Sequence, residues 1–263
     1  MEDVQSQKDH RNIALEKVGV KRLMYPITVL DRQNGSQQTI AEVEMSVDLP
    51  HSFRGTHMSR FVELLNRHRG EITMNTMGPI LRGMKKALSA RRAEMTLKFS
   101  YFVEKTAPVS GAKSLLNYDC RFFASYDGKK DDFVLTVVVP VTTLCPCSKA
   151  VSARSAHNQR SHVTVSTRFG GFLWIEDLIR MVEDSASAEI FSLLKRGDEK
   201  YLTERAYENP RFAEDLVREI ALKLDACPEV VWYAVETENH ESIHAHSAYA
   251  FYKRDKRLKN RKS

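Results

Sequence analysis

An order of predicted elements that occurs twice along the chain constrains the fold more than any single motif. Alternating apolar and polar residues predict strands, and apolar residues at helical spacing predict helices. The first half gives strand, strand, helix, helix, strand, strand, over residues 22–30, 39–50, 58–69, 75–90, 93–103 and 116–126. The second half repeats this order over residues 133–141, 162–169, 175–193, 209–227, 230–237 and 246–252.

These elements predict an α+β fold of two tandem modules, residues 21–129 and 130–253. Each module would hold an antiparallel four-stranded sheet with a helix pair on one face. Residues 1–20 are predicted to be an N-terminal extension. A sheet with open edges and one uncovered face tends to pair with another sheet or to close. We therefore expect an oligomer in which sheets join edge to edge.

The excess of positive charge lies at the C-terminal end. The 263 residues include 40 Lys and Arg against 34 Asp and Glu, and residues 253–263 hold seven basic and one acidic residue, which leaves 33 of each sign elsewhere. Residues 254–263 are predicted to be a solvated, disordered tail that binds no nucleic acid, because no aromatic residues interleave with the charges. No apolar stretch reaches the roughly 18 to 20 residues of a membrane helix. With a polar N-terminus, this predicts a cytoplasmic location and no membrane partner.

Two closely spaced cysteines follow the predicted strand 133–141, in the stretch TTLCPCSKAVSARSAHNQRSH (142–162). Pro146 between Cys145 and Cys147 removes a backbone donor, so we expect the strand to end there with both thiols at its mouth. In a reducing compartment, such a pair indicates metal binding or catalysis more than a disulfide. Nearby cations would favour the thiolate form, and these are Lys149, Arg154 and Arg160.

The residues of this stretch leave three interpretations open: a metal site, a thiol nucleophile, and two inert cysteines. Cys145, Cys147 and His157 supply thiolate and imidazole ligands of the kind that zinc prefers. The sequence lacks the repeated Cys-x-x-Cys pairs of a structural zinc module, and the zinc deaminase signature is incomplete. A metal here would need further ligands from a distant part of the chain.

A second polar cluster, ETENHESIHAHSAYA (236–250), lies between the last two predicted strands. In an extended or turn conformation His244 and His246 are expected to point the same way, with Glu241 on the connecting turn. A polar hairpin turn is the simpler interpretation, but beside a Cys/His cluster these groups become candidates for general acid–base catalysis. Two helical carboxylates are further candidates, although each is typical of a solvated helix surface: Glu199 and Glu214.

Four stretches together resemble the prokaryotic type IB GTP cyclohydrolases. They are LPHSFRGTHMSRF (49–61), LCPCSKAVSARSAHNQRSH (144–162), RFAEDLVR (211–218) and ENHESIHAHSAYAFY (238–252). The resemblance covers nearly the whole chain. It implies the tunnelling fold, with two modules per subunit, oligomeric barrels, and a homotetramer with sites between subunits. It also implies hydrolysis of GTP to 7,8-dihydroneopterin triphosphate and formate, the first step of folate biosynthesis.

Carried over position by position, the resemblance implies a role for each candidate residue. It implies one divalent ion per site, Zn²⁺, Mn²⁺ or Fe²⁺, bound by Cys145, His157 and Glu199. It implies that Cys147 is the essential thiol near the purine C8 and that Glu214 grips the nucleobase. Cys145 is also counted among the catalytic residues, together with Glu241, His244 and His246. The triphosphate needs cationic donors, and the candidates are Lys149, Arg154, Arg160 and Arg54.

Two other classes of function compete with this one. A related tunnelling-fold enzyme of pterin or deazapurine chemistry, such as a pterin synthase or a nitrile reductase, would share the sheet and a cysteine without releasing formate from GTP. A non-catalytic metal- or RNA-binding protein would use the cysteine stretch structurally and the basic tail electrostatically. Release of formate from GTP distinguishes a GTP cyclohydrolase from both of these alternatives.

Overall fold

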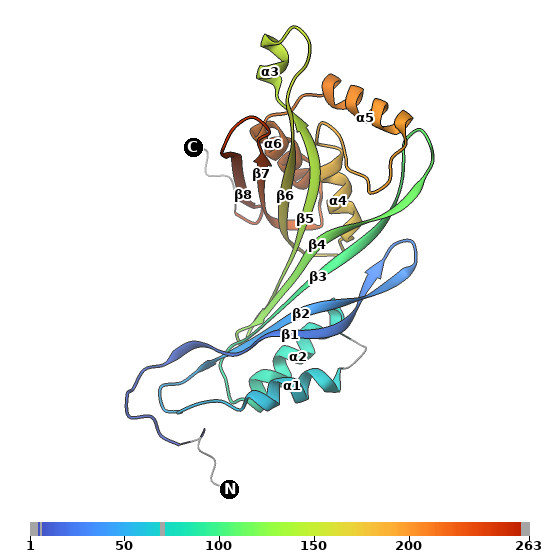
Figure 1. Cartoon of the computed structure of the whole chain (residues 1–263). Helices are drawn as coiled ribbons and strands as arrows, with labels where there is room; N and C mark the ends of the chain where they lie inside the picture. Colours follow the sequence, from blue (N-terminus) through green and yellow to red (C-terminus); the bar gives the residue numbers. More distant parts are fainter. Residues whose placement is uncertain (1–4, 6, 69–71, 259–263) are drawn as a thin grey trace. The chain divides into compact units, whose positions relative to one another are not determined.

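The structure is a computed structural model, and it describes residues 5, 7–68 and 72–258 (Figure 1). The strands are β1 (Leu15–Asp31), β2 (Gly35–Leu49), β3 (Ala93–Thr106), β4 (Lys113–Tyr126), β5 (Asp131–Leu144), β6 (Asn158–Phe169), β7 (Val230–His240) and β8 (Ser247–Asp255). The helices are α1 (Met58–Arg67), α2 (Met74–Ala87), α3 (Pro146–Val151), α4 (Ile175–Glu183), α5 (Arg196–Glu208) and α6 (Ala213–Ala226). Within the described ranges, no helix has the length and apolar character needed to span a membrane.

The strands form one eight-stranded sheet in chain order, from β1 to β8. The sheet is antiparallel and the fold class is α+β, as predicted. The chain divides into two compact units, unit 1 being Met1–Ser100 with Arg121–Leu135 and unit 2 being Tyr101–Cys120 with Thr136–Ser263. The residues that bound these units lie within or beside β3, β4 and β5. The division into tandem modules at residues 21–129 and 130–253 stays a prediction.

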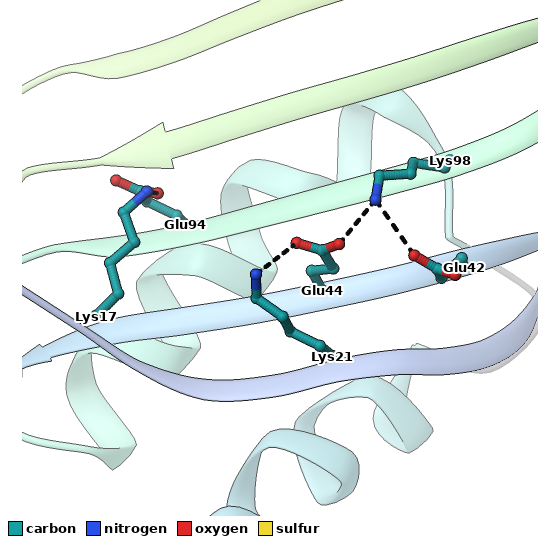
Figure 2. Close-up of polar contacts among 6 residues, drawn as sticks. All are labelled: Lys17, Lys21, Glu42, Glu44, Glu94 and Lys98. Atoms are coloured by element: carbon teal, nitrogen blue, oxygen red, sulfur yellow. Dashed lines mark hydrogen bonds and ion pairs between the residues drawn. The ribbon is translucent and has the colours of Figure 1, made fainter.

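Unit 1 has a sheet with one apolar and one charged face. On β2, Ala41, Val43 and Met45 are at most 1% exposed, and the two residues between them, Glu42 and Glu44, are half-buried. The helices α1 and α2 lie against the apolar face (Figure 1). Figure 2 shows the charged face, which six side chains cross in alternating signs: Lys17, Lys21, Glu42, Glu44, Glu94 and Lys98. We call these six residues the charge ladder.

Unit 2 packs α4 and α6 through apolar residues such as Leu178 and Ile220, which are fully buried. A buried charge cluster adds to this packing. Lys105 Nζ lies 2.7 Å from Glu183 Oε1 and 2.6 Å from Glu189 Oε2, and the hydroxyl of Tyr118 donates to Glu183 Oε1 over 2.8 Å. Burial raises the pKa of Glu183, although Lys105 and Tyr118 favour its ionised form.

The helices of the second half differ from the prediction. A single helix was expected over 175–193, but α4 ends at Glu183 because the following segment turns to pair with β5, where Thr142 and Ala188 exchange two backbone hydrogen bonds of 2.9 and 3.2 Å. The polar helix α5 was missing from the predicted order of elements, although Glu199, which lies on it, was expected to be helical. Asn209, where the next helix was predicted to begin, is the C-cap of α5, and its amide donates to the carbonyl of Ala186. The next helix, α6, therefore begins later than predicted, at Ala213.

Strands of the sheet overlap both predicted terminal segments. Strand β1 begins at Leu15, inside the predicted extension, and its partner is β2. At the other end, Arg254 and Asp255 belong to β8. Lys256 Nζ donates to the carbonyl oxygens of Leu224 and Asp225, at the end of α6, and of Cys227, its C-cap. A cation at this end of a helix complements the helix dipole. Of the predicted tail, only residues 259–263 lie outside the described residues.

Candidate functional site

The two thiols lie where β5 ends and the short helix α3 begins (Figure 1). Cys145 is the N-cap of α3, and its Sγ accepts a hydrogen bond of 3.4 Å from the backbone N–H of Ser148. Pro146 takes the first helical position, where no backbone donor is needed. The strand therefore ends at the thiols, as predicted. Cys145 is half-buried and Cys147 is exposed, so the two sulfurs differ in access to solvent.

We call residues 144–147, which join β5 to α3 and carry both thiols, the thiol turn. Neighbouring segments hold its backbone. The N–H of Leu144 donates to Ser187 Oγ over 3.1 Å, and the N–H of Cys145 donates to the carbonyl of His157 over 3.1 Å. Leu144 also packs into a small apolar cluster with Ala188 and with Ala206 of α5. The second of these bonds places Cys145 and His157, which are twelve residues apart in the sequence, on adjacent backbone.

The imidazole of His157 meets residues from the distant polar cluster. Its side chain is 13% exposed, and its Nδ1 lies 3.6 Å from Glu241 Oε2. The rings of His157 and His244 have centroids 6.2 Å apart, and the rings of His244 and His246 stack at 5.2 Å. The structure thus brings together Cys145, His157, Glu241 and the two histidines, in line with the expectation that His244 and His246 point the same way.

The donor atoms around Cys145 fit a divalent transition metal in their chemistry. A thiol and an imidazole suit Zn²⁺ or Fe²⁺, and His157 Nδ1 is buried with no hydrogen-bond partner among the described residues. A buried nitrogen without a partner is costly unless something binds it. However, within the described residues no three or more His, Cys, Asp or Glu side chains are grouped closely enough to hold a metal. The predicted third ligand, Glu199, is therefore not gathered with the other two.

Glu199 instead lines an open pocket of about 250 Å³ at the start of α5. The pocket also contains Arg160, Asn158 and Glu189. Two cations hold the Glu189 carboxylate, with Lys105 Nζ at 2.6 Å and Arg205 Nη1 at 3.5 Å. Two predicted residues, Glu199 and Arg160, therefore share one pocket that offers both a carboxylate and a guanidinium.

The other predicted substrate-binding residues are placed separately. Glu214 is exposed at the start of α6, where it lines a mostly apolar pocket of about 470 Å³ between α6 and β8. Lys149 Nζ donates to the carbonyl of Tyr207 and lies 4.3 Å from the centre of that ring. Arg154 is exposed on the loop after α3. Arg54 belongs to unit 1, where its guanidinium donates to Gln7 Oε1 over 3.0 Å.

One histidine pair was not singled out from the sequence. His162 Nδ1 and His240 Nε2 lie 3.1 Å apart across β6 and β7. Burial lowers the pKa of His162, and the neighbouring His240 and Arg160 lower it further. The available signal was the alternation of β6, which places His162 on the same face as Arg160; the register of β6 with β7 was needed to find its partner.

Comparisons with known proteins decide the family. The sequence model of the family described as type I GTP cyclohydrolase FolE2 matches residues 1–250. The chain belongs to this family. It is 55% identical over 258 residues to GTP cyclohydrolase FolE2 of Geobacter metallireducens, with 98% of both chains covered. It is 56% identical over 255 residues to GTP cyclohydrolase FolE2 of Syntrophus aciditrophicus, with 97% of this chain and 100% of that one covered.

Solved structures that resemble this FolE2 family member include urate oxidases. The uricase from Arthrobacter globiformis has a TM-score of 0.53 at 9% identity, with 94% of both chains covered. A mutant of the urate oxidase from Bacillus sp. TB-90 has a TM-score of 0.57 at 8% identity, with 92% of this chain and 100% of that one covered. At such low identity the likeness concerns the fold alone. Because the folds of these neighbours are similar to the tunnelling fold, they support the predicted fold of the single chain. The assembly of chains into barrels stays a prediction.

Proposed function

We propose that the thiol turn and the polar cluster around Glu241 carry out the GTP cyclohydrolase reaction of this family. The chain is a GTP cyclohydrolase of folate biosynthesis, and the reaction converts GTP and water into 7,8-dihydroneopterin triphosphate and formate. The observation that carries the assignment is the meeting of His157 with Glu241 at 3.6 Å and with His244. This contact joins two sequence motifs that are more than eighty residues apart.

The reaction sets three demands on the protein. Water must add at C8 of the guanine, the imidazole ring must open, and formate must leave. Ring opening needs a proton delivered to nitrogen and another removed from oxygen, which suits histidines and a carboxylate near neutral pH. Glu241, His244 and His246 are the groups we assign to these proton transfers.

Cys145 and His157 would hold the divalent metal, with Glu199 as the proposed third ligand. When bound, such an ion lowers the pKa of water toward ~7 and so supplies a nucleophile. We assign Cys147, whose thiol is exposed, to the position near C8. Arg160 and Lys149 are assigned to the triphosphate, and Glu214 to the nucleobase. Arg54 stays a candidate for the triphosphate.

The test of this function is direct. Metal-free protein and protein loaded with Zn²⁺, Mn²⁺ or Fe²⁺ are incubated with GTP, and formate and a fluorescent pterin are measured after oxidation. We expect stoichiometric formate and pterin with at least one ion and neither product without metal. Absence of product with all three ions would contradict the proposal.

We also propose a homotetramer with sites between subunits. Strand β8 lies at the edge of the sheet, and large apolar side chains are exposed on it and on α6, which indicates an interaction surface; they are Leu222, Tyr249, Phe251 and Tyr252. Glu214 lines the pocket under this surface. This position is consistent with Glu214 of one copy binding the nucleobase at the thiol turn of another copy.

Mixed oligomers test whether sites are shared. Cys147→Ala and Glu214→Ala are each expected to be inactive, and the two are unfolded and refolded together in equal amounts. If each site takes Cys147 from one copy and Glu214 from another, random mixing restores about a quarter of the sites. A mixture as inactive as its parents would contradict sharing, and light scattering checks that both variants remain oligomers.

The competing RNA-binding function can be tested without damaging the fold. Deleting residues 253–263 would remove part of β8 and the Lys256 cap of α6, so the deletion should be confined to residues 259–263. We expect this shorter deletion to leave GTP turnover unchanged. Salt-dependent RNA binding that the deletion abolishes would support the competing function. The cytoplasmic location stays a prediction from sequence.

A further inference from the structure

A chain of buried hydrogen bonds crosses β5, β6 and β7 beneath the proposed site. Thr143 Oγ1 and Ser161 Oγ are 2.8 Å apart. Asn239 Nδ2 donates to Thr143 Oγ1 over 3.3 Å, and Thr237 Oγ1 donates to Asn239 Oδ1 over 2.9 Å. All four side chains are at most 1% exposed. Four polar side chains buried in one place are costly unless each finds its partners, so this chain constrains where the three strands lie.

The two middle members of these hydrogen bonds, Thr143 and Asn239, lie close in sequence to the two halves of the proposed site. Thr143 stands two residues before Cys145, and Asn239 stands two residues before Glu241. Ser161 and Asn239 are direct cross-strand partners in the β6–β7 register. The bond from Asn239 to Thr143 therefore links the end of β5 to the end of β7 without passing through the backbone ladder of β6.

The two backbone hydrogen bonds described for the thiol turn connect it to other segments but not to β7. Ser187 and His157 hold Leu144 and Cys145 on the sides of the 185–190 segment and of β6. Neither contact reaches β7. Among the described residues, the bond from the Asn239 amide to Thr143 is the side-chain hydrogen bond that we find between the end of β5 and β7, the strand that leads to Glu241.

We propose that Asn239 and Thr143 are positioning residues of the GTP cyclohydrolase site. Their hydrogen bond sets the distance between the thiol turn and the Glu241 turn, so that the thiol and the proton-transfer groups meet the same purine ring. The inference rests on the proposed site residues. Because a misplacement of about 1 Å can cost on the order of 100-fold in rate, small relaxation at this link affects turnover more than it affects folding.

The same two strands provide a matched control. Thr136 Oγ1 and Ser166 Oγ are 2.9 Å apart, and they form another hydroxyl pair between β5 and β6. Thr136 is 5% exposed and lies seven residues before Thr143 on β5, away from the thiol turn. Replacing either threonine by valine removes a hydroxyl and keeps the shape of the side chain. The Thr143 hydroxyl accepts a hydrogen bond from Asn239 of β7, whereas the Thr136 hydroxyl pairs with Ser166 of β6.

The experiment compares Thr143→Val, Thr143→Ser and Thr136→Val in the full-length, metal-loaded enzyme. We expect Thr143→Val to lower kcat by about 10-fold to 100-fold, with KM for GTP within about twofold and with unchanged metal content. Metal should remain because the Cys145 to His157 bond does not involve Thr143. Thr143→Ser keeps the hydroxyl and should recover most of kcat. Thr136→Val should keep kcat within about twofold of the wild-type value, even if its melting temperature falls as far as that of Thr143→Val.

The outcomes separate this inference from the site assignment. If Cys147→Ala retains turnover, the site assignment fails and this inference fails with it. If Cys147→Ala is inactive while Thr143→Val and Thr136→Val turn over equally fast, the positioning role alone is wrong. The same holds if Thr143→Ser is no better than Thr143→Val. Should Thr143→Val not fold, Thr237→Val and Thr237→Ser give the same comparison from the other end of the chain.

Discussion

The charge ladder of unit 1 and the thiol turn of unit 2 both place polar side chains on strands of one sheet, but they treat charge differently. In the charge ladder, Lys98 Nζ lies 2.8 Å from Glu44 and 3.2 Å from Glu42 (Figure 2). The hydrogen bond to Lys98 lowers the pKa of Glu44, and the carboxylates raise the pKa of Lys98. Each partner holds the other in its charged form, which makes both poor acids and bases near neutral pH.

At the thiol turn the polar groups are not matched in this way. His157 Nδ1 has no hydrogen-bond partner among the described residues, and Glu241 stops at 3.6 Å. The nearest side-chain partner of His162 Nδ1 is another histidine, His240, at 3.1 Å. Groups left with unused donors and acceptors inside a fold are the ones available to a ligand. The comparison indicates a structural role for the polar face of unit 1, and it supports the binding role that we propose for the polar end of β5–β7.

The largest effect should come from the exposed thiol. Cys147→Ala is expected to lower kcat by about 10⁴-fold or more, in the range seen when an essential nucleophile is removed, while metal content stays unchanged. Cys145→Ala should lose metal as well. Turnover and metal content, measured on the same samples, distinguish the two. Identical behaviour of both variants would show that the assigned division between ligand and reactive thiol is wrong.

The second effect concerns stability and separates buried from exposed ion pairs. The Lys105 side chain is 7% exposed and lies between two carboxylates. Lys105→Met leaves the largely buried Glu183 without its cation, whereas Glu189 keeps Arg205 at 3.5 Å; breaking a buried pair in this way costs about 3–5 kcal/mol. Denaturant unfolding measures the loss. A loss below about 1 kcal/mol would place this cluster with the exposed pairs of the charge ladder.

The third prediction compares one carboxylate from each region. Glu241→Gln removes a proton acceptor next to His157 and should lower kcat by about 100-fold. Glu44→Gln removes a half-buried carboxylate of the charge ladder and should leave kcat unchanged. Steady-state kinetics with GTP measures both variants, and circular dichroism checks that both fold. Equal losses in the two variants would remove the distinction between the two regions.

Much of the sheet could be predicted from the sequence because burial follows a period of two. The alternation of Ala41, Val43 and Met45 with glutamates fixed β2, since each apolar residue is buried there. The second helix region failed for two reasons. The apolar residues after Glu183 belong to a segment that pairs with β5. Helix α5 shows no apolar face in the sequence, because its only buried residues are Ala206 and the charged Asp198.

The site could be predicted in its parts and not in its contacts. The proline between the cysteines correctly indicated the end of β5, and the sequence proximity of Cys145 and His157 already suggested that they meet. The contact between His157 and Glu241 depends on the register of β6 with β7, which places Arg160 opposite His240. No local pattern sets that register. Glu199 and Glu214 line two different pockets, which no spacing along the chain could indicate.

A smaller effect should appear in the pH dependence of stability. Burial raises the pKa of Glu183 in the folded state, so the folded protein binds this proton more tightly than the unfolded chain does. Stability from this group is therefore lost as pH rises from the unfolded value of 4.5 through the folded pKa. Glu183→Gln lacks this dependence. Unfolding free energies at pH 4 and pH 7 should show the wild type losing stability relative to the variant as the pH rises, and parallel curves would contradict the shift.

The smallest effect is expected in the charge ladder itself. The Lys98 side chain is 48% exposed and that of Glu44 is 25% exposed, so solvent and salt screen their attraction. Lys98→Met should cost at most about 1 kcal/mol in unfolding free energy, because exposed pairs contribute little. The cost should shrink further in 1 M salt, and GTP turnover should not change. A loss as large as that of Lys105→Met, or any loss of turnover, would mean that the charge ladder does more than neutralise its own charges.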